Sequence, residues 1–289
     1  MIRTVSVIRI ACFALVVFLS GLHVQGDLGK EFPEPDRQEL YFGQTPPQEK
    51  AEPFAPDVLI HEPHDSPVIA PDEKWLLFQG MEADLMFYGM KSGRLTAMDN
   101  PLGVEFPKVC NGVALSPSGE RFYIEEWKDG RNHLFYIDRK RDQWSSPSYV
   151  DLGGEGNWWQ ISISSNGNLY FSRDAIMVSS IVDGSHVKPV PLKLEDGSDM
   201  MGMSPFISPD ESYIICSIDG DLHISYRISD GKWTKPVDLG PNINSDQLEL
   251  CPQITSNGKY LIFNTRRNFP QFAIYWADAS FVEALRPKK

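Results

Sequence analysis

The chain has 289 residues and an acidic composition, in which 27 Lys and Arg face 39 Asp and Glu for a formal net charge of −12. An acidic surface repels phosphate backbones and anionic lipid, so the composition argues against nucleic acid as a partner. The length suits one large all-β domain once a short leader is set aside.

The first residues have the features of a secretory signal peptide. Arg3 and Arg9 precede an unbroken apolar run of ten residues, and residues 24–26 (Val-Gln-Gly) suit a cleavage site. That run is about half the roughly 20 residues that a helix needs to cross a bilayer. We expect residues 1–26 to be removed and the mature protein to be exported, periplasmic or extracellular, without membrane insertion. Retention of the segment as an anchor is the alternative.

Residues 27–53 follow with a composition that favours an extended leader. They are rich in Pro, Glu, Asp and Gln and poor in bulky apolar residues. Such a segment cannot bury enough apolar surface to pack by itself.

A short phrase then recurs five times and is the strongest pattern in the chain. Each copy has an apolar pair, a Ser/Pro-Asp/Asn-Gly type of turn and a bulky apolar strand, at residues 66–78, 112–124, 159–171, 204–216 and 251–263. Equivalent anchor positions are Pro71, Pro117, Ser165, Pro209 and Ser256, which are 46, 48, 44 and 47 residues apart. These spacings are close to the period of one four-stranded propeller blade.

The repeats predict five blades of four antiparallel strands. Blade five lacks its outer strand at the C-terminal end, where residues 281–285 favour a short helix. Residues 54–60 resemble an outer strand without a blade, so we expect them to complete blade five and close the ring, which removes two exposed sheet edges. The predicted fold is an all-β, five-bladed β-propeller over residues 54–289. A six-bladed ring would need to build a blade from residues 27–60, which have too few apolar residues.

Several motifs resemble the WD40-like propeller repeats of the TolB type found in bacterial exported proteins. They are Pro71-Asp72, Pro209-Asp210, and residues 239–245 (Leu-Gly-Pro-Asn-Ile-Asn-Ser) followed by Glu249, Pro252, Asn257-Gly258 and Arg266. The resemblance covers residues 54–278 and is strongest in blade five. Blades one to three lack the Asn-Ser pair, and blade three has Ser165-Asn166 in place of Pro-Asp. The resemblance implies a periplasmic or extracellular propeller that is used for protein or glycan contact, generally without chemistry.

One mouth of the central channel is the predicted binding site, because loops and strand tips from every blade converge there. Aromatic, acidic and arginine side chains in these segments suit a carbohydrate or an extended peptide. The predicted ligand-binding residues are Trp127, Arg131, Trp158, Arg173, Asn244, Glu249, Arg266 and Arg267. Trp158 and Trp159 are adjacent in a strand, so at least one of them is expected to pack between blades. The cluster of Met200, Met201 and Met203 fits either an adaptable contact surface or inter-blade packing.

A carbohydrate-active enzyme, either a glycoside hydrolase or a polysaccharide lyase, is the alternative function. It would need two carboxylates on either side of the scissile bond, and the candidates are Asp65 with Glu126 or Glu249. The sequence has no nucleophile elbow, phosphate-binding glycine loop or dinucleotide fingerprint. His61 and His64 have no third partner that would make a metal site, so neither metal nor cofactor is expected. We therefore favour a non-catalytic binding or scaffold module.

Three cysteines remain beyond the signal peptide: Cys110, Cys216 and Cys251. An odd number in an exported chain argues against a disulfide framework. Buried free thiols are expected, and a bridge between Cys216 and Cys251 is the alternative.

Overall fold

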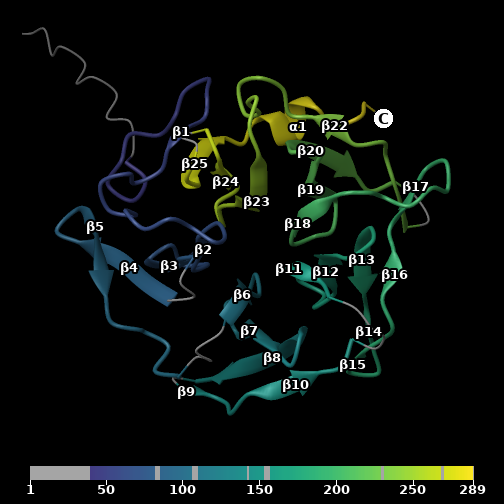
Figure 1. The fold of residues 1–289 in the computed structure, drawn as a ribbon, viewed down its shortest axis with the longest axis horizontal. Coiled ribbons are helices and arrows are strands. Elements are labelled where there is room, and N and C mark those ends of the chain that lie inside the picture. Colours follow the sequence, from purple (N-terminus) through teal and green to yellow (C-terminus); the bar gives the residue numbers. More distant parts are fainter. Residues whose placement is uncertain are drawn as a thin grey trace, which may run out of the picture. The chain divides into compact units, whose positions relative to one another are not determined.

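A computed structural model describes residues 40–81, 85–105, 110–141, 143–152, 157–228, 231–267 and 270–288, with the side chains of residues 110 and 111 left aside. These residues form five antiparallel four-stranded sheets arranged in a ring, which is a five-bladed β-propeller (Figure 1). The predicted fold class is therefore confirmed. The predicted signal peptide lies outside the described residues, and no helix within them is long and apolar enough to span a membrane.

Each blade is built in chain order from the channel outwards, except for the outer strand of blade five. Blade one comprises β2 (Val68–Ile69), β3 (Trp75–Gln79), β4 (Leu85–Lys91) and β5 (Arg94–Met98). Blade two comprises β6 (Cys110–Leu115), β7 (Arg121–Lys128), β8 (Arg131–Lys140) and β10 (Ser148–Val150), with β9 (Gln143–Trp144) also paired to β8. Blade three comprises β11 (Trp159–Ile163), β12 (Leu169–Ser172), β13 (Ile176–Ser179) and β16 (Val190–Pro191).

Blade four comprises β18 (Met203–Ile207), β19 (Tyr213–Ile218), β20 (Asp221–Tyr226) and β22 (Val237–Asp238). Blade five comprises β23 (Glu249–Ile254), β24 (Tyr260–Thr265), β25 (Ala273–Asp278) and β1 (Glu52–Pro53). Two short pairs lie outside the blades: β14 (Ile181–Val182) with β15 (Ser185–His186), and β17 (Lys193–Leu194) parallel to β21 (Lys232–Trp233). The predicted C-terminal helix is α1 (Phe281–Ala284).

The repeated phrase folds into the same turn in every blade. The residue before each anchor position accepts, through its backbone carbonyl, a hydrogen bond of 2.8–2.9 Å from the residue three positions later. These five anchor turns lie at residues 70–74, 116–120, 164–168, 208–212 and 255–259 and join the innermost strand to the second strand. The Pro, Asp, Asn, Ser and Gly residues of the phrase are those that such turns prefer.

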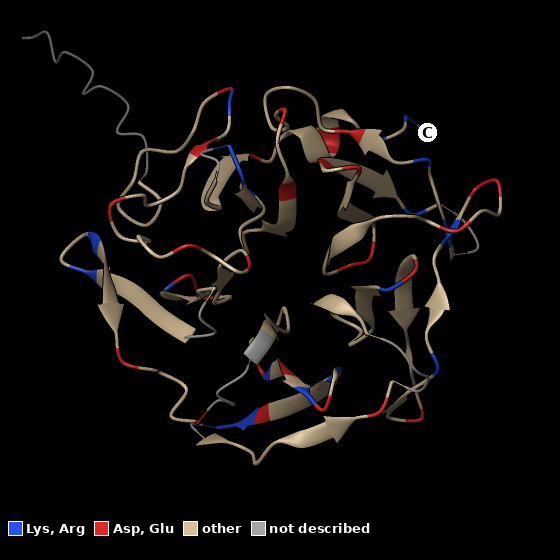
Figure 2. Cartoon of the chain, viewed as in Figure 1, with Lys and Arg blue, Asp and Glu red and all other residues tan. Residues whose placement is uncertain are grey.

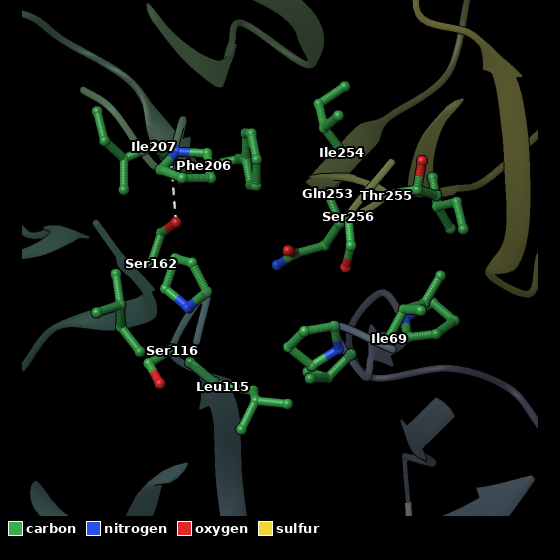
Figure 3. Close-up of a pocket in the computed structure, with 18 of the residues that line it drawn as sticks. Ile69, Leu115, Ser116, Ser162, Phe206, Ile207, Gln253, Ile254, Thr255 and Ser256 are labelled. Atoms are coloured by element: carbon green, nitrogen blue, oxygen red, sulfur yellow. Dashed lines mark hydrogen bonds between the residues drawn. The ribbon is translucent and has the colours of Figure 1, made fainter. Parts of the chain in front are cut away.

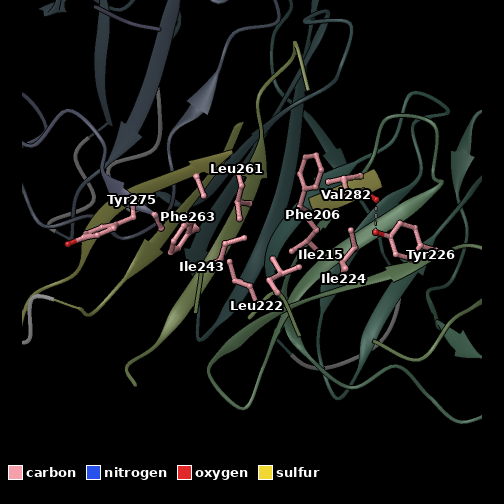
Figure 4. Close-up of a cluster of buried hydrophobic side chains, with 13 residues drawn as sticks. Phe206, Ile215, Leu222, Ile224, Tyr226, Ile243, Leu261, Phe263, Tyr275 and Val282 are labelled. Carbon is pink, nitrogen blue, oxygen red and sulfur yellow. Dashed lines mark hydrogen bonds between the residues drawn. The ribbon is translucent and has the colours of Figure 1, made fainter. Parts of the chain in front are cut away.

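Apolar second and third strands pack against those of the neighbouring blade. Between blades four and five, for example, Phe206, Ile215 and Leu222 pack with Leu261 and Phe263 in one buried cluster (Figure 4). Helix α1 covers the outer end of this cluster, where the Tyr226 hydroxyl donates a hydrogen bond of 2.6 Å to the Val282 carbonyl. Acidic and basic residues are distributed around all five blades, mainly in the loops (Figure 2).

The ring closes through β1, but at a register that differs from the prediction. Glu52 pairs with Trp276 and Pro53 with Tyr275, and the Phe54 amide adds one bond of 2.9 Å to the Ile274 carbonyl. The expected strand over residues 54–60 is therefore wrong beyond Phe54. Ala55 has a φ of 47° and begins a turn, because Pro56-Asp57 is a turn pair and cannot extend the strand.

The described part of the expected leader packs against the propeller. Tyr41 and Phe42 are buried, and the Tyr41 ring lies 4.9 Å from that of Tyr260 and 5.9 Å from that of Trp276. The Ala55 amide donates a hydrogen bond of 2.7 Å to the side-chain carbonyl of Gln44. These two aromatic residues belong to the buried cluster between blades five and one.

Candidate functional site

A β-bulge interrupts the innermost strand of four blades near the same mouth of the channel. The register shifts between Cys110 and Gly112 in β6, between Trp159 and Ser162 in β11, between Met203 and Phe206 in β18, and between Leu250 and Gln253 in β23. Three residues at these bulges have left-handed backbone angles: Gln160, Ser204 and Cys251, with φ of 54°, 52° and 53°. Such angles are uncommon for residues other than glycine and concentrate at functional sites, where a bulge re-aims a side chain.

The bulged positions converge on a small cavity in the channel. Each lies five residues before its anchor position, and the five equivalent residues, Ser66, Gly112, Gln160, Ser204 and Cys251, all line the cavity. Asp65 and Glu125 line it as well. Its volume is about 30 Å³, which is room for one water-sized group. We call this cavity the channel neck.

Beyond the neck the channel widens into an apolar section of about 220 Å³ that reaches the anchor turns (Figure 3). Ile69, Leu115, Phe206, Ile207 and Ile254 are among its lining residues, and Ile161 and Gln253 line both this section and the neck. The wider section is lined by no Asp or Glu, so the carboxyl groups that line these two cavities belong to the neck.

Asp65 is the most heavily bonded carboxylate of the neck. Its Oδ1 accepts hydrogen bonds from the Gln160 amide at 2.8 Å and the Cys251 thiol at 3.4 Å, and its Oδ2 lies 3.4 Å from Nδ1 of His64. Burial alone would raise the pKa of Asp65, but His64, Gln160 and Cys251 together hold it below its usual value. The bond to Asp65 raises the pKa of His64. Asp65 is therefore an ionised carboxylate at neutral pH.

Glu125, at the end of the buried part of β7, has the opposite character. It is 2% exposed, its Oε1 accepts a hydrogen bond of 3.2 Å from the Ile161 amide, and its Oε2 has no partner among the described residues. Burial and, next, the charge of Asp65 raise the pKa of Glu125 to about 8. The neck therefore holds one ionised and one protonated carboxyl group at neutral pH.

Gly112 allows these two carboxyl groups to approach the same point. A Cβ atom placed on Gly112 would lie 3.0 Å from Glu125 Oε1 and 3.6 Å from Asp65 Oδ2. Any larger residue at this position would push the Glu125 carboxyl away, because 3.0 Å is shorter than an ordinary van der Waals contact.

Large exposed apolar side chains surround the mouth above the neck. They lie in the loops that lead into the innermost strands, at the first residue of such a strand, or near the tips between second and third strands. Each is between 38% and 73% exposed: Ile60, Met81, Trp127, Trp159, Met201, Met203 and Leu248. All five blades contribute to this set, which we call the mouth ring. In the described chain, the five anchor turns at the opposite mouth carry no large exposed apolar side chain.

Three of the predicted ligand-binding residues make hydrogen bonds within the fold. Glu249 is fully buried and accepts hydrogen bonds from Ser245, Thr265 and Arg267. Arg267 also donates to the Ile243 carbonyl and lies over the Tyr275 ring. Asn244 bonds to both backbone groups of Leu222 in β20. The polar segment before blade five is thus tied to both blade four and blade five.

The remaining predicted residues divide between packing and the mouth. Trp158 is buried in the core between blades two and three, whereas Trp159 is 48% exposed, as the alternation of a strand predicts. Met200 is buried, while Met201 and Met203 belong to the mouth ring.

Trp127 and Arg131 are exposed at the tip of blade two. Arg173 and Arg266 are half-buried and lie over the rings of Phe171 and Phe272, at 5.9 and 4.4 Å.

The carboxylate pair predicted for an enzyme is not the one that the structure brings together. Asp65 meets Glu125, whereas Glu126, the next residue of β7, does not line the neck. Glu125 belongs to a repeated feature, because each second strand has, at or next to the end of its buried run, a polar residue that is at most 3% exposed: Gln79, Glu125, Ser172, Ser217 and Asn264. Aligning the repeats at this position would have identified Glu125.

The described cysteines form no bridge. Cys216 and Cys251 are both free and buried, so the alternative of a disulfide between them is wrong. Burial and, next, the charge of Asp65 raise the pKa of the Cys251 thiol well above its usual range, which keeps it protonated and unreactive.

The comparisons with known proteins find distant structural similarity and no relative by sequence. The sequence matches no known protein family and no curated protein. Among solved structures, TolB from Acinetobacter baumannii has a TM-score of 0.42 at 15% identity, over 73% of this chain and 53% of TolB. The periplasmic gluconolactonase PpgL from Pseudomonas aeruginosa has a TM-score of 0.41 at 15% identity, over 74% and 68%.

A third similar structure is the PQQ-bound aldose sugar dehydrogenase from Streptomyces coelicolor, with a TM-score of 0.41 at 14% identity, over 80% of this chain and 99% of that one. This chain spans about half the length of the TolB that it matches. With TM-scores below 0.5 and identities of 15% or less, these likenesses carry no argument about a shared ligand or reaction.

Proposed function

We propose that this chain is an exported, non-catalytic binding module that holds an apolar segment of a partner protein at the mouth ring. The observation that carries the proposal is the gathering of seven large exposed apolar side chains, from all five blades, around one mouth of the channel. Exposed apolar surface of this kind on a soluble domain marks an interaction site. Export is supported by the features of residues 1–26.

The composition of the mouth ring favours a protein over a glycan. Five of its seven members are Met, Ile or Leu, and only Trp127 and Trp159 are aromatic. Methionine and tryptophan are enriched at protein interfaces, and methionine adapts its shape to a partner surface. A sugar site needs hydrogen-bonding groups beside its aromatic platform, and the predicted candidates Asn244, Glu249 and Arg267 are engaged within the fold.

The size of the neck favours binding over hydrolysis. A glycosidase places its two carboxylates on either side of a sugar, about 5–10 Å apart. Asp65 and Glu125 instead line a cavity that holds one water-sized group. A scissile bond at the mouth would therefore not lie between them.

A peptide selection tests the proposal directly. Residues 27–289 would be immobilised and used to select binders from a phage-displayed library of random peptides, and affinities of the selected peptides would be measured by calorimetry. The double variant Trp159→Ala/Met203→Ala should lose at least about tenfold in affinity, because truncating a buried interface tryptophan typically costs 2 kcal/mol or more. The matched control Val190→Ala/Val237→Ala removes exposed apolar groups from outer strands and should change affinity less than about twofold.

Two results would contradict the proposal. Selected peptides that bind both double variants equally well would place recognition elsewhere. If the protein releases reducing sugar from any of a panel of polysaccharides, and Asp65→Asn abolishes this release, the protein is an enzyme and the proposed function is wrong.

A further inference from the structure

We infer that the channel neck is a pocket for one primary ammonium group carried by the bound segment, either a lysine side chain or an N-terminal amine. The inference rests on the proposed function and names the polar determinant of the same site. Its first support is a set of buried acceptors without partners. Glu125 Oε2 and Ser66 Oγ, in residues that are 2% and 5% exposed, have no hydrogen-bond partner in the described part of the chain, and both residues line the neck. Buried acceptors of this kind are costly unless a donor reaches them.

The charge of the neck favours a cation. Asp65 is ionised, and Glu125 stays protonated only because it is buried beside that charge. A positive group beside them would favour the ionised form of Glu125 and neutralise one of the two negative charges. Both carboxyl groups approach the side of Gly112 that lacks a side chain, where a Cβ atom would lie 3.0 Å from Glu125 Oε1 and 3.6 Å from Asp65 Oδ2. An ammonium group offers three donors, which suits the acceptors Asp65, Glu125 and Ser66.

The size and composition of the neck favour an ammonium group over a guanidinium group or a metal ion. A volume of about 30 Å³ fits a compact ammonium group, whereas the planar five-donor guanidinium of arginine is larger. No group of three or more His, Cys, Asp and Glu side chains in the described residues is arranged to hold a metal ion. Val113, Ile161, Pro205 and Pro252 line the same cavity and would contact the methylene groups next to the nitrogen.

Two residues of the neck directly follow residues of the mouth ring in the sequence. Trp159 of the ring precedes Gln160 of the neck, and Met203 precedes Ser204. Because adjacent residues of a strand point in different directions, one strand presents an apolar contact at the mouth and a polar contact in the neck. A ligand that fills both would carry its ammonium group within an apolar stretch, as a lysine between apolar residues or an apolar N-terminus does.

Calorimetry at pH 8 with simple amines tests the pocket. n-Butylamine should bind to residues 27–289, whereas butanol, which lacks the charge, and butyltrimethylammonium, which lacks the donors, should not. Glu125→Gln should weaken butylamine binding at least about tenfold, because glutamine cannot take up the negative charge that Glu125 would carry beside the bound ammonium group, while the shape of the side chain is kept. The control Glu120→Gln makes the same change on an exposed residue of the anchor turn of blade two and should have no effect. If Glu125→Gln does not fold, Ser66→Ala should weaken binding by a smaller factor.

Peptides from the selection distinguish the two sources of the amine. Acetylating the N-terminus should abolish binding if the α-amine enters the neck, and replacing lysine by norleucine should do so if the side chain enters. Selected peptides whose affinity survives both changes would overturn the inference while leaving the proposed function intact. If CaCl₂ stabilises the protein, butylamine does not, and Glu125→Gln removes the effect of CaCl₂, the neck is a metal site and the inference is overturned. Butylamine binding without any selected peptide would support the pocket and remove the proposed function.

Discussion

Glu125 is the residue whose protonation controls the channel neck, and it makes stability depend on pH. Its pKa is about 8 in the folded protein against an ordinary value of 4.5. Between these pH values the folded chain holds a proton that the unfolded chain has lost, so stability falls as pH rises, by up to about 1.4 kcal/mol per pH unit. His64, whose pKa is also raised, adds stability below its ordinary 6.5 that is lost at higher pH. The lowered pKa of Asp65 lies below this pH range, so Asp65 does not contribute to the change in stability with pH there.

Urea denaturation at pH 5, 6, 7, 8 and 9 measures this dependence. Glu125→Gln should flatten the fall in unfolding free energy between pH 5 and 8, because glutamine stays neutral throughout. Glu120→Gln, on the exposed anchor turn, should retain the slope of the natural protein. A slope unchanged by Glu125→Gln would mean that the carboxyl is ionised in the folded state, contrary to the protonated state described here.

At the scale of elements, the closing strand β1 depends on Phe54. Its side chain is 1% exposed and packs edge-on to Trp276, with ring centroids 5.3 Å apart, where β1 meets β25. Phe54→Ala should cost about 3–5 kcal/mol of unfolding free energy, the range for large cavities in cores. Leu40→Ala, at an exposed position of the same N-terminal segment, should stay within about 0.5 kcal/mol. Equal effects in chemical denaturation would show that the closing strand does not support the ring.

The sequence predicts these elements better than it predicts the site. The spacing of the anchor positions predicts the number of blades, because each anchor turn is formed by Pro, Asp, Asn, Ser and Gly residues that are close together in the sequence. The closing strand lies a few residues earlier in the chain than predicted. Its pairing is made with β25, more than 200 residues away, so the local sequence of residues 54–60 does not reveal where the strand ends. The sequence does not separate Glu125 from the predicted candidate Glu126, because second strands are buried on both faces and alternation does not say which residue faces the channel.

Glu249 and Arg267 show the same limit for charged residues. Both lie in segments that lead to the mouth, which made them candidates, yet each is the other's partner across the β23–β24 pair. An ion pair of this kind cannot be read from residue types alone, because 39 acidic residues offer many alternative partners. The bulges that aim Gln160, Ser204 and Cys251 into the neck have no common residue type, so they too appear only in the structure.

At the scale of the whole molecule, the two mouths of the channel differ, and this asymmetry predicts where a bound peptide protects the backbone. The mouth ring and the neck lie at the end where second and third strands meet, while the apolar section opens toward the anchor turns. A peptide that spans the mouth ring should slow amide exchange in the segments that carry it. These are residues 60–65, 79–81, 126–132, 157–160, 200–204 and 245–250.

Hydrogen exchange measured by mass spectrometry, with and without a selected peptide, checks this distribution. Exchange in the five anchor turns should stay unchanged, because they lie at the other end of every innermost strand and are held by their own backbone bonds of 2.8–2.9 Å. Trp159→Ala/Met203→Ala should remove the protection at all six segments together, since they contact one ligand. Protection confined to the anchor turns would instead make the apolar section the binding site, because its lining includes Pro71, Pro117 and Pro209 of those turns.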